Sequence, residues 1–136
     1  MVRLSAKKPC PCHSGRKTKS CCGPILKGMD APTPLALMQS RYAAYATRHT
    51  DHIINTTHPD SPHHQTNRDV WRSQIEVFCD AFEFVGLTIH DSGAEAFQGW
   101  VAFTAHLNQG EQDASFTERS RFFRQNGVWL YHSAIV

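Results

Sequence analysis

Four of the five cysteines lie within thirteen residues, in the pattern Cys-x-Cys-x8-Cys-Cys formed by Cys10, Cys12, Cys21 and Cys22. A segment this short has few apolar side chains with which to stay folded. Four thiolates converging on one tetrahedral Zn²⁺ would hold it, because zinc accepts ligand sets made only of cysteine. In comparable peptides such binding contributes about 10–16 kcal/mol. The spacing therefore predicts a zinc site with these four ligands.

Disulfide bonds and free thiols are the alternatives. The adjacent Cys21 and Cys22 cannot easily bond to one another, and a bridge from Cys10 to Cys12 would close a strained ring, which leaves two long-loop disulfides. Residues 1–9 carry charges and no apolar run, so we find no secretory signal there. We therefore expect a cytoplasmic, reducing compartment, in which disulfides are rare.

The residues between the two cysteine pairs suit a turn. Gly15 can adopt a positive φ after Ser14, which would bring the two halves of the ligand set together. His13 is a competing nitrogen ligand, and we expect it to lie outside the ligand set.

Basic residues are concentrated at the start of the chain. Residues 1–27 hold seven basic and no acidic side chains, net +7, whereas residues 28–136 hold seven basic and twelve acidic ones, net −5. Zinc with four thiolates would leave the first segment near +5. Such a patch favours an acidic protein partner, with RNA or the ribosome as an alternative, unless the lysines only keep the segment soluble. These residues are Arg3, Lys7, Lys8, Arg16, Lys17, Lys19 and Lys27.

Apolar residues at helical spacing predict three helices in the next part of the chain. Thr33 is suited to cap the first helix, with Pro34 at the first helical position. Asn67 is suited to cap the third, and Gly86 to end it. The predicted helices cover 34–48, 51–57 and 68–85.

After Leu87 the apolar residues alternate, which predicts strands. Asn126-Gly127 is the strongest hairpin signal, and a two-residue turn there places Phe123 opposite Leu130. The result is an α+β fold, in which a curved antiparallel sheet of about four strands wraps a helix. The predicted strands cover 87–91, 99–107, 115–125 and the residues after 127, with turns at 92–93 and 108–110.

These patterns divide the chain into a knuckle, 1–27, a linker, 28–34, and one domain, 35–136. No segment approaches the roughly 18 consecutive apolar residues that a membrane span needs.

Two known families are similar to this sequence. The cysteine run, with Ser14-Gly15 and several lysines inside it, closely resembles the SEC-C motif, the metal-binding tail of the SecA translocation ATPase. Most of the remaining chain resembles the bacterial YchJ family, in which a SEC-C knuckle precedes a nuclear-transport-factor-two-like (cystatin-like) domain of three helices on a bent antiparallel sheet. That family commonly has Trp where Thr57 stands here. The segments that carry this resemblance are 37–45, 51–54, 57–59, 86–87, 118–122 and 127–131.

The resemblance implies zinc and a fold, and it assigns no reaction. We favour a non-enzymatic binding or adaptor protein, because SecA uses its SEC-C motif for contacts with an export chaperone. Cone folds often pair through the sheet, so a homodimer is also expected by analogy.

The alternative is a small-molecule-binding or hydrolase- or isomerase-like domain, with a pocket between helices and sheet. In it Glu118 would act as base, His58 as acid, and an arginine would hold an anion. We expect Arg41 itself on the surface or paired with Glu118. The Glu-Arg-Ser-Arg strand equally fits cross-strand ion pairs, and we favour that interpretation over catalysis. The pocket candidates are Arg41, Tyr42, His58, Trp71, Glu118, Arg119 and Ser120.

Overall fold

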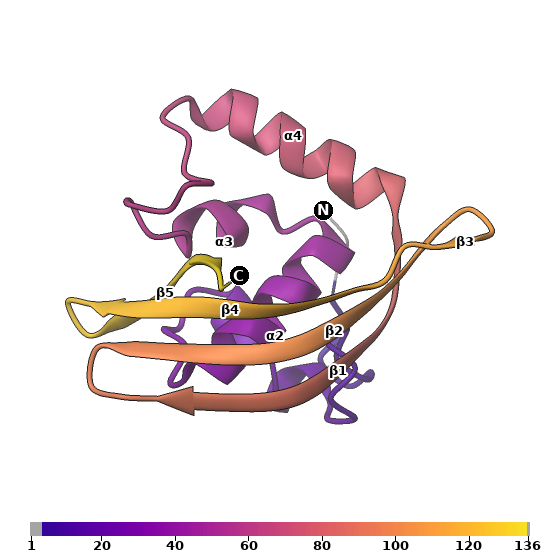
Figure 1. Ribbon diagram of the computed structural model, residues 1–136. Helices are drawn as coiled ribbons and strands as arrows, with labels where there is room; N and C mark the ends of the chain where they lie inside the picture. The colour runs from indigo at the N-terminus through magenta and orange to yellow at the C-terminus, as the bar shows by residue number, and fades with distance from the viewer. Residues whose placement is uncertain (1–3, 136) are drawn as a thin grey trace.

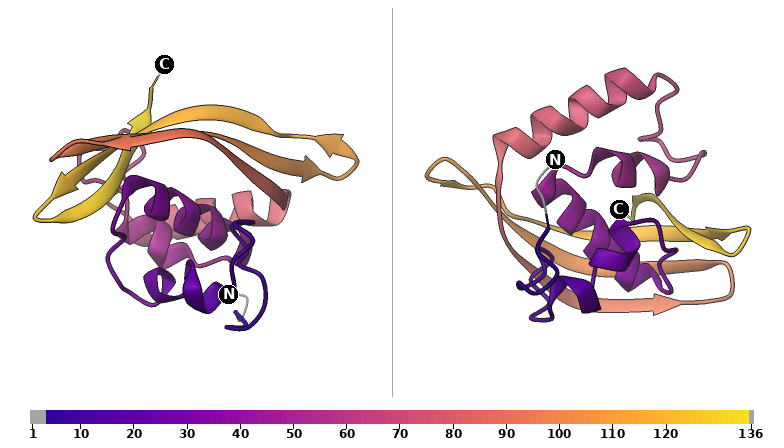
Figure 2. Two further views of the ribbon diagram at one scale, coloured as in Figure 1. Left: turned by 90° about the horizontal axis from the view of Figure 1, so that it is seen from below. Right: turned by 180° about the vertical axis from the view of Figure 1, so that it is seen from behind.

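A bent antiparallel sheet carries all the helices of the described chain on one face (Figures 1 and 2). The computed structural model describes residues 4–135. The strand order is β1-β2-β4-β5, and the short β3 pairs with β2. The α+β class and the cone of helices on a curved sheet are as predicted. The strands are β1 (Glu83–Ala94), β2 (Gln98–Gln109), β3 (Gln112–Asp113), β4 (Phe116–Gln125) and β5 (Val128–Ala134).

The two long helices begin where the capping residues predict. Thr33 Oγ1 accepts a hydrogen bond from Ala36 N at 3.1 Å, and Asn67 Oδ1 accepts one from Val70 N at 3.1 Å. Each cap satisfies a backbone N–H that has no partner inside its helix. The helices are α1 (Gly23–Leu26), α2 (Pro34–Thr47), α3 (Thr50–Asn55) and α4 (Arg68–Ala81), with a 3₁₀ turn, η1 (Thr18–Ser20).

The end of α4 differs from the prediction. The helix stops at Ala81, and Phe82 is already extended, with φ −130° and ψ 148°. Gly86 therefore does not end a helix, and its N–H donates to the Tyr42 hydroxyl at 3.1 Å. The reason is strand pairing, because Glu83 already lies opposite Asn108 of β2.

The predicted turn at residues 92–93 is also wrong. Strand β1 continues to Ala94, and the reversal follows at Glu95, whose N–H donates to Gln98 O at 2.7 Å. Gly93 has a packing role instead, because a Cβ there would come within 2.0 Å of the Trp100 ring. Of the turn predicted at 108–110, Gly110 is confirmed, with φ +61°, whereas Asn108 and Gln109 still belong to β2.

The hairpin between β4 and β5 has the predicted register. Gln125 lies opposite Val128 and Phe123 opposite Leu130, with Asn126 and Gly127 at φ 52° and 80°. Both turn residues are left-handed, as a tight hairpin requires.

The core lies between α2 and the concave face of the sheet. Strand β2 alternates, so that Val101, Phe103, Ala105 and Leu107 are buried. Side chains of α2, including Leu37, pack against them. In the described part of the chain, no helix has the length and apolar character needed to cross a membrane.

Candidate metal centre and candidate ligand cavity

The four predicted cysteine ligands meet at one point. The sulfur atoms of Cys10, Cys12, Cys21 and Cys22 all lie within 4.8 Å of one another. Cys12 Sγ is 3.4 Å from Cys21 Sγ, which is 3.8 Å from Cys22 Sγ. All four thiols are free, and three of them are buried. Such a cluster could hold a metal ion.

Tight turns bring these cysteines together. Gly15 has φ +86°, as expected for the turn, and His13 is also left-handed, at φ +62°. The His13 ring lies edge-on to Tyr42, 5.9 Å away, and its Nε2 is 3.3 Å from Phe84 O. His13 therefore faces β1 and α2 and stays outside the sulfur cluster.

Neighbouring groups are directed at the sulfurs. Arg16 Nη2 donates to Cys21 Sγ at 3.4 Å, and Ser14 Oγ lies 3.2 Å from the same sulfur. Hydrogen bonds from Cys12 and Cys22 lower the pKa of Cys10 to about 2. The contact with Cys10 in turn raises the pKa of Cys12 to about 12 and also raises that of Cys22. Ionisation of one thiol thus disfavours ionisation of its neighbours. A divalent cation would supply the positive charge that lets all four sulfurs be thiolates.

The knuckle is packed onto the helical layer. Cys10, Cys12 and Cys22 form a buried cluster with Ala43 of α2. Ile25 of α1 belongs to the main core. The cysteine cluster is therefore joined to the domain by buried contacts.

The basic side chains of the knuckle are solvent-exposed. Six of them are exposed, and none of the ion pairs found within residues 4–135 involves them. Arg3 lies outside the described residues. The six are Lys7, Lys8, Arg16, Lys17, Lys19 and Lys27.

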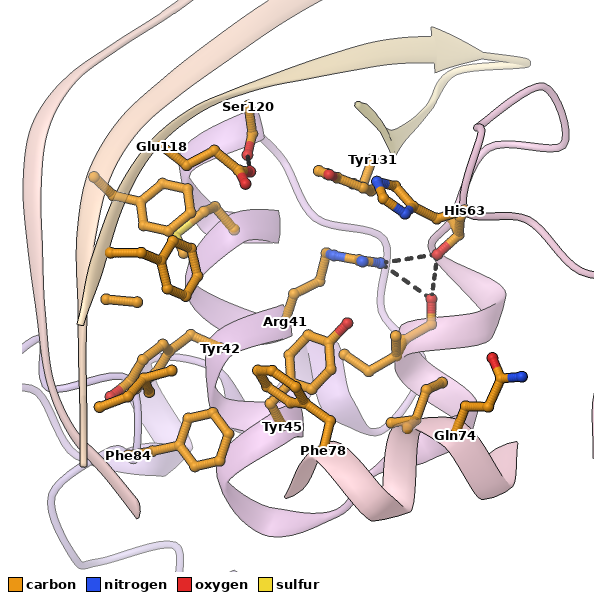
Figure 3. A pocket seen from close by; sticks show the side chains of 18 of the residues that line it. Arg41, Tyr42, Tyr45, His63, Gln74, Phe78, Phe84, Glu118, Ser120 and Tyr131 are labelled. Carbon is orange, nitrogen blue, oxygen red and sulfur yellow. Dashed lines mark hydrogen bonds between the residues drawn. The ribbon is translucent and has the colours of Figure 1, made fainter. Parts of the chain in front are cut away.

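A cavity of about 590 Å³ lies between the sheet, α2 and α4 (Figure 3). This volume is in the range of sites that bind small organic molecules. Its wall is largely aromatic, with Arg41 and Glu118 among the polar groups. The aromatic side chains are Tyr42, Tyr45, Trp71, Phe78, Phe84, Phe103, Phe116, Phe122 and Tyr131.

Arg41 is buried in this wall, contrary to the surface position expected from the sequence. It is 8% exposed. Its Nη1 donates to Ile53 O at 3.0 Å and to the hydroxyls of Thr56 and Thr57 at 2.8 and 3.2 Å. The guanidinium carbon also lies 4.5 Å from the centre of the Tyr131 ring. The end of α3 and the strand β5 thus fix a cation at the cavity.

Glu118 faces the cavity from β4. Its Oε2 accepts a hydrogen bond from Ser120 Oγ at 2.5 Å (Figure 3). The ion pairs within residues 4–135 do not include one between Glu118 and Arg41, so the expected direct pair is not formed.

Of the other four pocket candidates, two line the cavity and two lie outside it. Tyr42 and Trp71 line the cavity. Arg119 instead lies over Trp100, with its guanidinium carbon 5.3 Å from the ring. His58 is outside the lining, where its Nδ1 accepts from Asp60 N at 3.0 Å and its ring meets His132.

Two further phenols line the cavity that sequence reasoning did not select. Burial raises the pKa of Tyr45, and it raises that of Tyr131 to about 12, so both remain hydrogen-bond donors. Tyr45 occupies a position on the apolar stripe of α2. Its hydroxyl is the one sequence feature that could have identified it as a cavity residue, because a buried hydroxyl needs a hydrogen-bond partner.

Known proteins share the sequence pattern and the fold of this chain. The family model described as YchJ, middle NTF2-like domain, matches residues 33–134. A UPF0225 protein of Deinococcus radiodurans is 40% identical over 129 residues, covering 93% of this chain and 88% of the relative. A UPF0225 protein of Serratia proteamaculans is 40% identical over 128 residues, and the match covers 90% of this chain and 79% of the relative.

Solved structures show the same fold. A SEC-C motif containing protein from Rhodopseudomonas palustris is 32% identical, with a TM-score of 0.82, and the match covers 95% of this chain and 98% of that one. An LEH-like epoxide hydrolase from M. tuberculosis is 14% identical, with a TM-score of 0.52. The match covers 71% of this chain and 73% of that one, and it shows a shared fold alone.

Proposed function

Since the chain belongs to the YchJ family, we propose that its SEC-C knuckle holds one zinc ion and presents a basic surface to an acidic protein partner. The sulfur cluster carries the first half of this proposal. A tetrahedral zinc site with Zn–S bonds near 2.3 Å places its sulfurs about 3.8 Å apart. The two sulfur–sulfur distances at Cys21, 3.4 and 3.8 Å, are compatible with that value. When bound, zinc supplies charge neutralisation and a cross-link.

Zinc content tests the ligand set directly. Elemental analysis of the purified, reduced protein should find about one zinc per chain, as one closed tetrahedral site requires. Cys21→Ser should lose most of it, whereas Cys79→Ser, which changes the cysteine of α4 outside the cluster, should keep it. Equal zinc content in the two variants would contradict the assignment.

The exposed basic side chains support an adaptor role. Lys17 and Lys19 lie between the two cysteine pairs in the sequence, are exposed, and have no acidic partner within residues 4–135. Even with zinc and four thiolates, the knuckle keeps a positive charge. Such a surface attracts acidic groups in a salt-dependent way.

A charge reversal separates this role from simple solubility. We expect Lys17→Glu with Lys19→Glu to weaken binding of a glutamate-rich peptide about tenfold at low salt, because two attractions become repulsions. Arg121→Glu with Arg124→Glu, two exposed changes on β4 with the same total change of charge, is the matched control. Single-stranded RNA should bind less tightly than the peptide; the reverse order would favour RNA as partner.

The cavity supports small-molecule binding as a second candidate function. Its 590 Å³ is lined mainly by aromatic and aliphatic groups, with a smaller number of polar ones, which is the usual composition of a ligand site. Filling it tests the idea: Ala105→Phe, in the floor of the cavity, should abolish the binding of aromatic ligands detected by NMR while leaving the zinc content unchanged.

A further inference from the structure

Arg41 lies in the cavity with an unsatisfied charge. All its hydrogen bonds within residues 4–135 come from Nη1 and go to neutral oxygens. Nη2 and Nε have no partner there, and no ion pair within those residues includes Arg41. Both atoms are open to the cavity, because Trp100 Nε1 is the one buried side-chain polar atom of the described residues that lacks a partner. Buried charges are normally paired, since an uncompensated one is costly to remove from water.

The groups around Arg41 are suited to a carboxylate. A guanidinium presents a planar pair of donors that matches the two oxygens of a carboxylate. The aromatic rings of Tyr45 and Tyr131 adjoin the guanidinium in the cavity wall (Figure 3), and each carries a hydroxyl that has no hydrogen bond within the described chain. These hydroxyls can donate hydrogen bonds to an anion in place of the water molecules that it loses on entering the cavity.

Glu118 disfavours a more highly charged ligand. Its carboxylate lines the same cavity and would repel a phosphate dianion, which a single arginine would neutralise only in part. Toward a ligand, Glu118 is an acceptor, since Ser120 already donates to Oε2. It therefore calls for a hydroxyl or other donor on the ligand.

Aromatic rings form much of the remaining wall. They include Phe78 of α4 and, from three strands of the sheet, Phe84, Phe103 and Phe122. These faces favour a flat apolar body, because ring contacts add to the free energy of burying apolar surface.

We propose that the cavity binds an aromatic monocarboxylate, with the carboxylate against Arg41 and a hydroxyl group donating to Glu118. This inference rests on the second candidate function, small-molecule binding, and is independent of the zinc site.

Matched probes test the two polar contacts on the full-length, zinc-loaded protein. The affinities of 4-hydroxyphenylacetate, its neutral amide and phenylacetate are measured by titration calorimetry or NMR. The hydroxy acid should bind about tenfold to a hundredfold more tightly than the amide, as a charge-assisted hydrogen bond to a buried group predicts. It should also bind more tightly than phenylacetate, which lacks the donor.

Two variants assign these preferences to residues. Arg41→Met should remove the preference for acid over amide, and Glu118→Gln should reduce the preference for the hydroxy acid over phenylacetate. Arg119→Met is the control, because this neighbour of Glu118 lies over Trp100 on the other face of the sheet. If Arg41→Met fails to fold, the comparison of acid and amide on the unchanged protein still decides.

The outcomes distinguish the carboxylate assignment from small-molecule binding in general. Acid and amide binding equally well would leave the cavity a ligand site and overturn the carboxylate assignment. No binding of any probe up to its solubility limit would overturn both. An acid preference that survives in Arg41→Met, with fold intact, would place the anion elsewhere and also overturn the assignment.

Discussion

The buried arginine of α2 affects the ionisation of its neighbours. His52 of α3 lies close to Arg41, with its Nε2 2.8 Å from Ser40 Oγ. Burial, together with the positive charge of Arg41 and the nearby His49, lowers the pKa of His52 to about 4. In the folded chain this histidine is therefore neutral well below the pH at which it would protonate when unfolded.

That shift predicts a pH dependence of stability. Between pH 6.5 and about 4 the unfolded chain binds a proton at His52 and the folded chain does not, so stability falls as the pH falls through this window. The loss from this residue is at most about 3 kcal/mol. Urea unfolding across the window should show a shallower decline in His52→Gln than in the unchanged protein. Parallel curves for the two proteins would show that His52 is not the source.

At the scale of elements, the start of α2 is set by a single side chain. Thr33 Oγ1 satisfies the backbone N–H of Ala36. Thr33→Ala should cost about 1 kcal/mol of unfolding free energy, whereas Thr33→Ser, which keeps the hydroxyl, should cost much less. Chemical denaturation of the three proteins measures the difference. A loss in the serine variant as large as in the alanine variant would point to the lost methyl group instead of the cap.

Local patterns predicted the elements that local interactions determine. Caps and the Asn126-Gly127 hairpin depend on residues adjacent in sequence, and each lies where expected. The cysteine spacing likewise predicted the sulfur cluster. Gly93 was misread as a turn because its role depends on the Trp100 ring across the hairpin.

The cavity was harder to predict for the same reason. Arg41 takes its partners from α3, twelve to sixteen residues later in the chain, and from Tyr131 of β5. Helical periodicity shows only that Arg41 sits beside an apolar stripe, and it cannot show what covers that side of α2. Tyr45 and Tyr131 gain their cavity position from the same tertiary packing.

At the scale of the whole molecule, the knuckle and the domain share buried surface. The cysteine cluster packs on Ala43, and Ile25 joins the main core. Unfolding the knuckle would therefore expose one side of α2, the helix that also carries Arg41 and Tyr45. Metal binding and the stability of the domain should be coupled.

Removing the metal tests this coupling. A chelator under reducing conditions should lower the melting temperature of the entire chain by about 10 °C or more, because several kcal/mol of metal-binding free energy support the packed knuckle. Circular dichroism and tryptophan fluorescence, to which Trp71 of the cavity contributes beside Trp100 and Trp129, should report the same transition. Cys79→Ser is the matched control: its thiol is buried in α4, which raises its pKa to about 11, so the variant should keep both zinc and the response to the chelator. If zinc is lost while the fluorescence transition does not move, the knuckle folds as a separate unit, and ligand binding in the cavity is then independent of the metal.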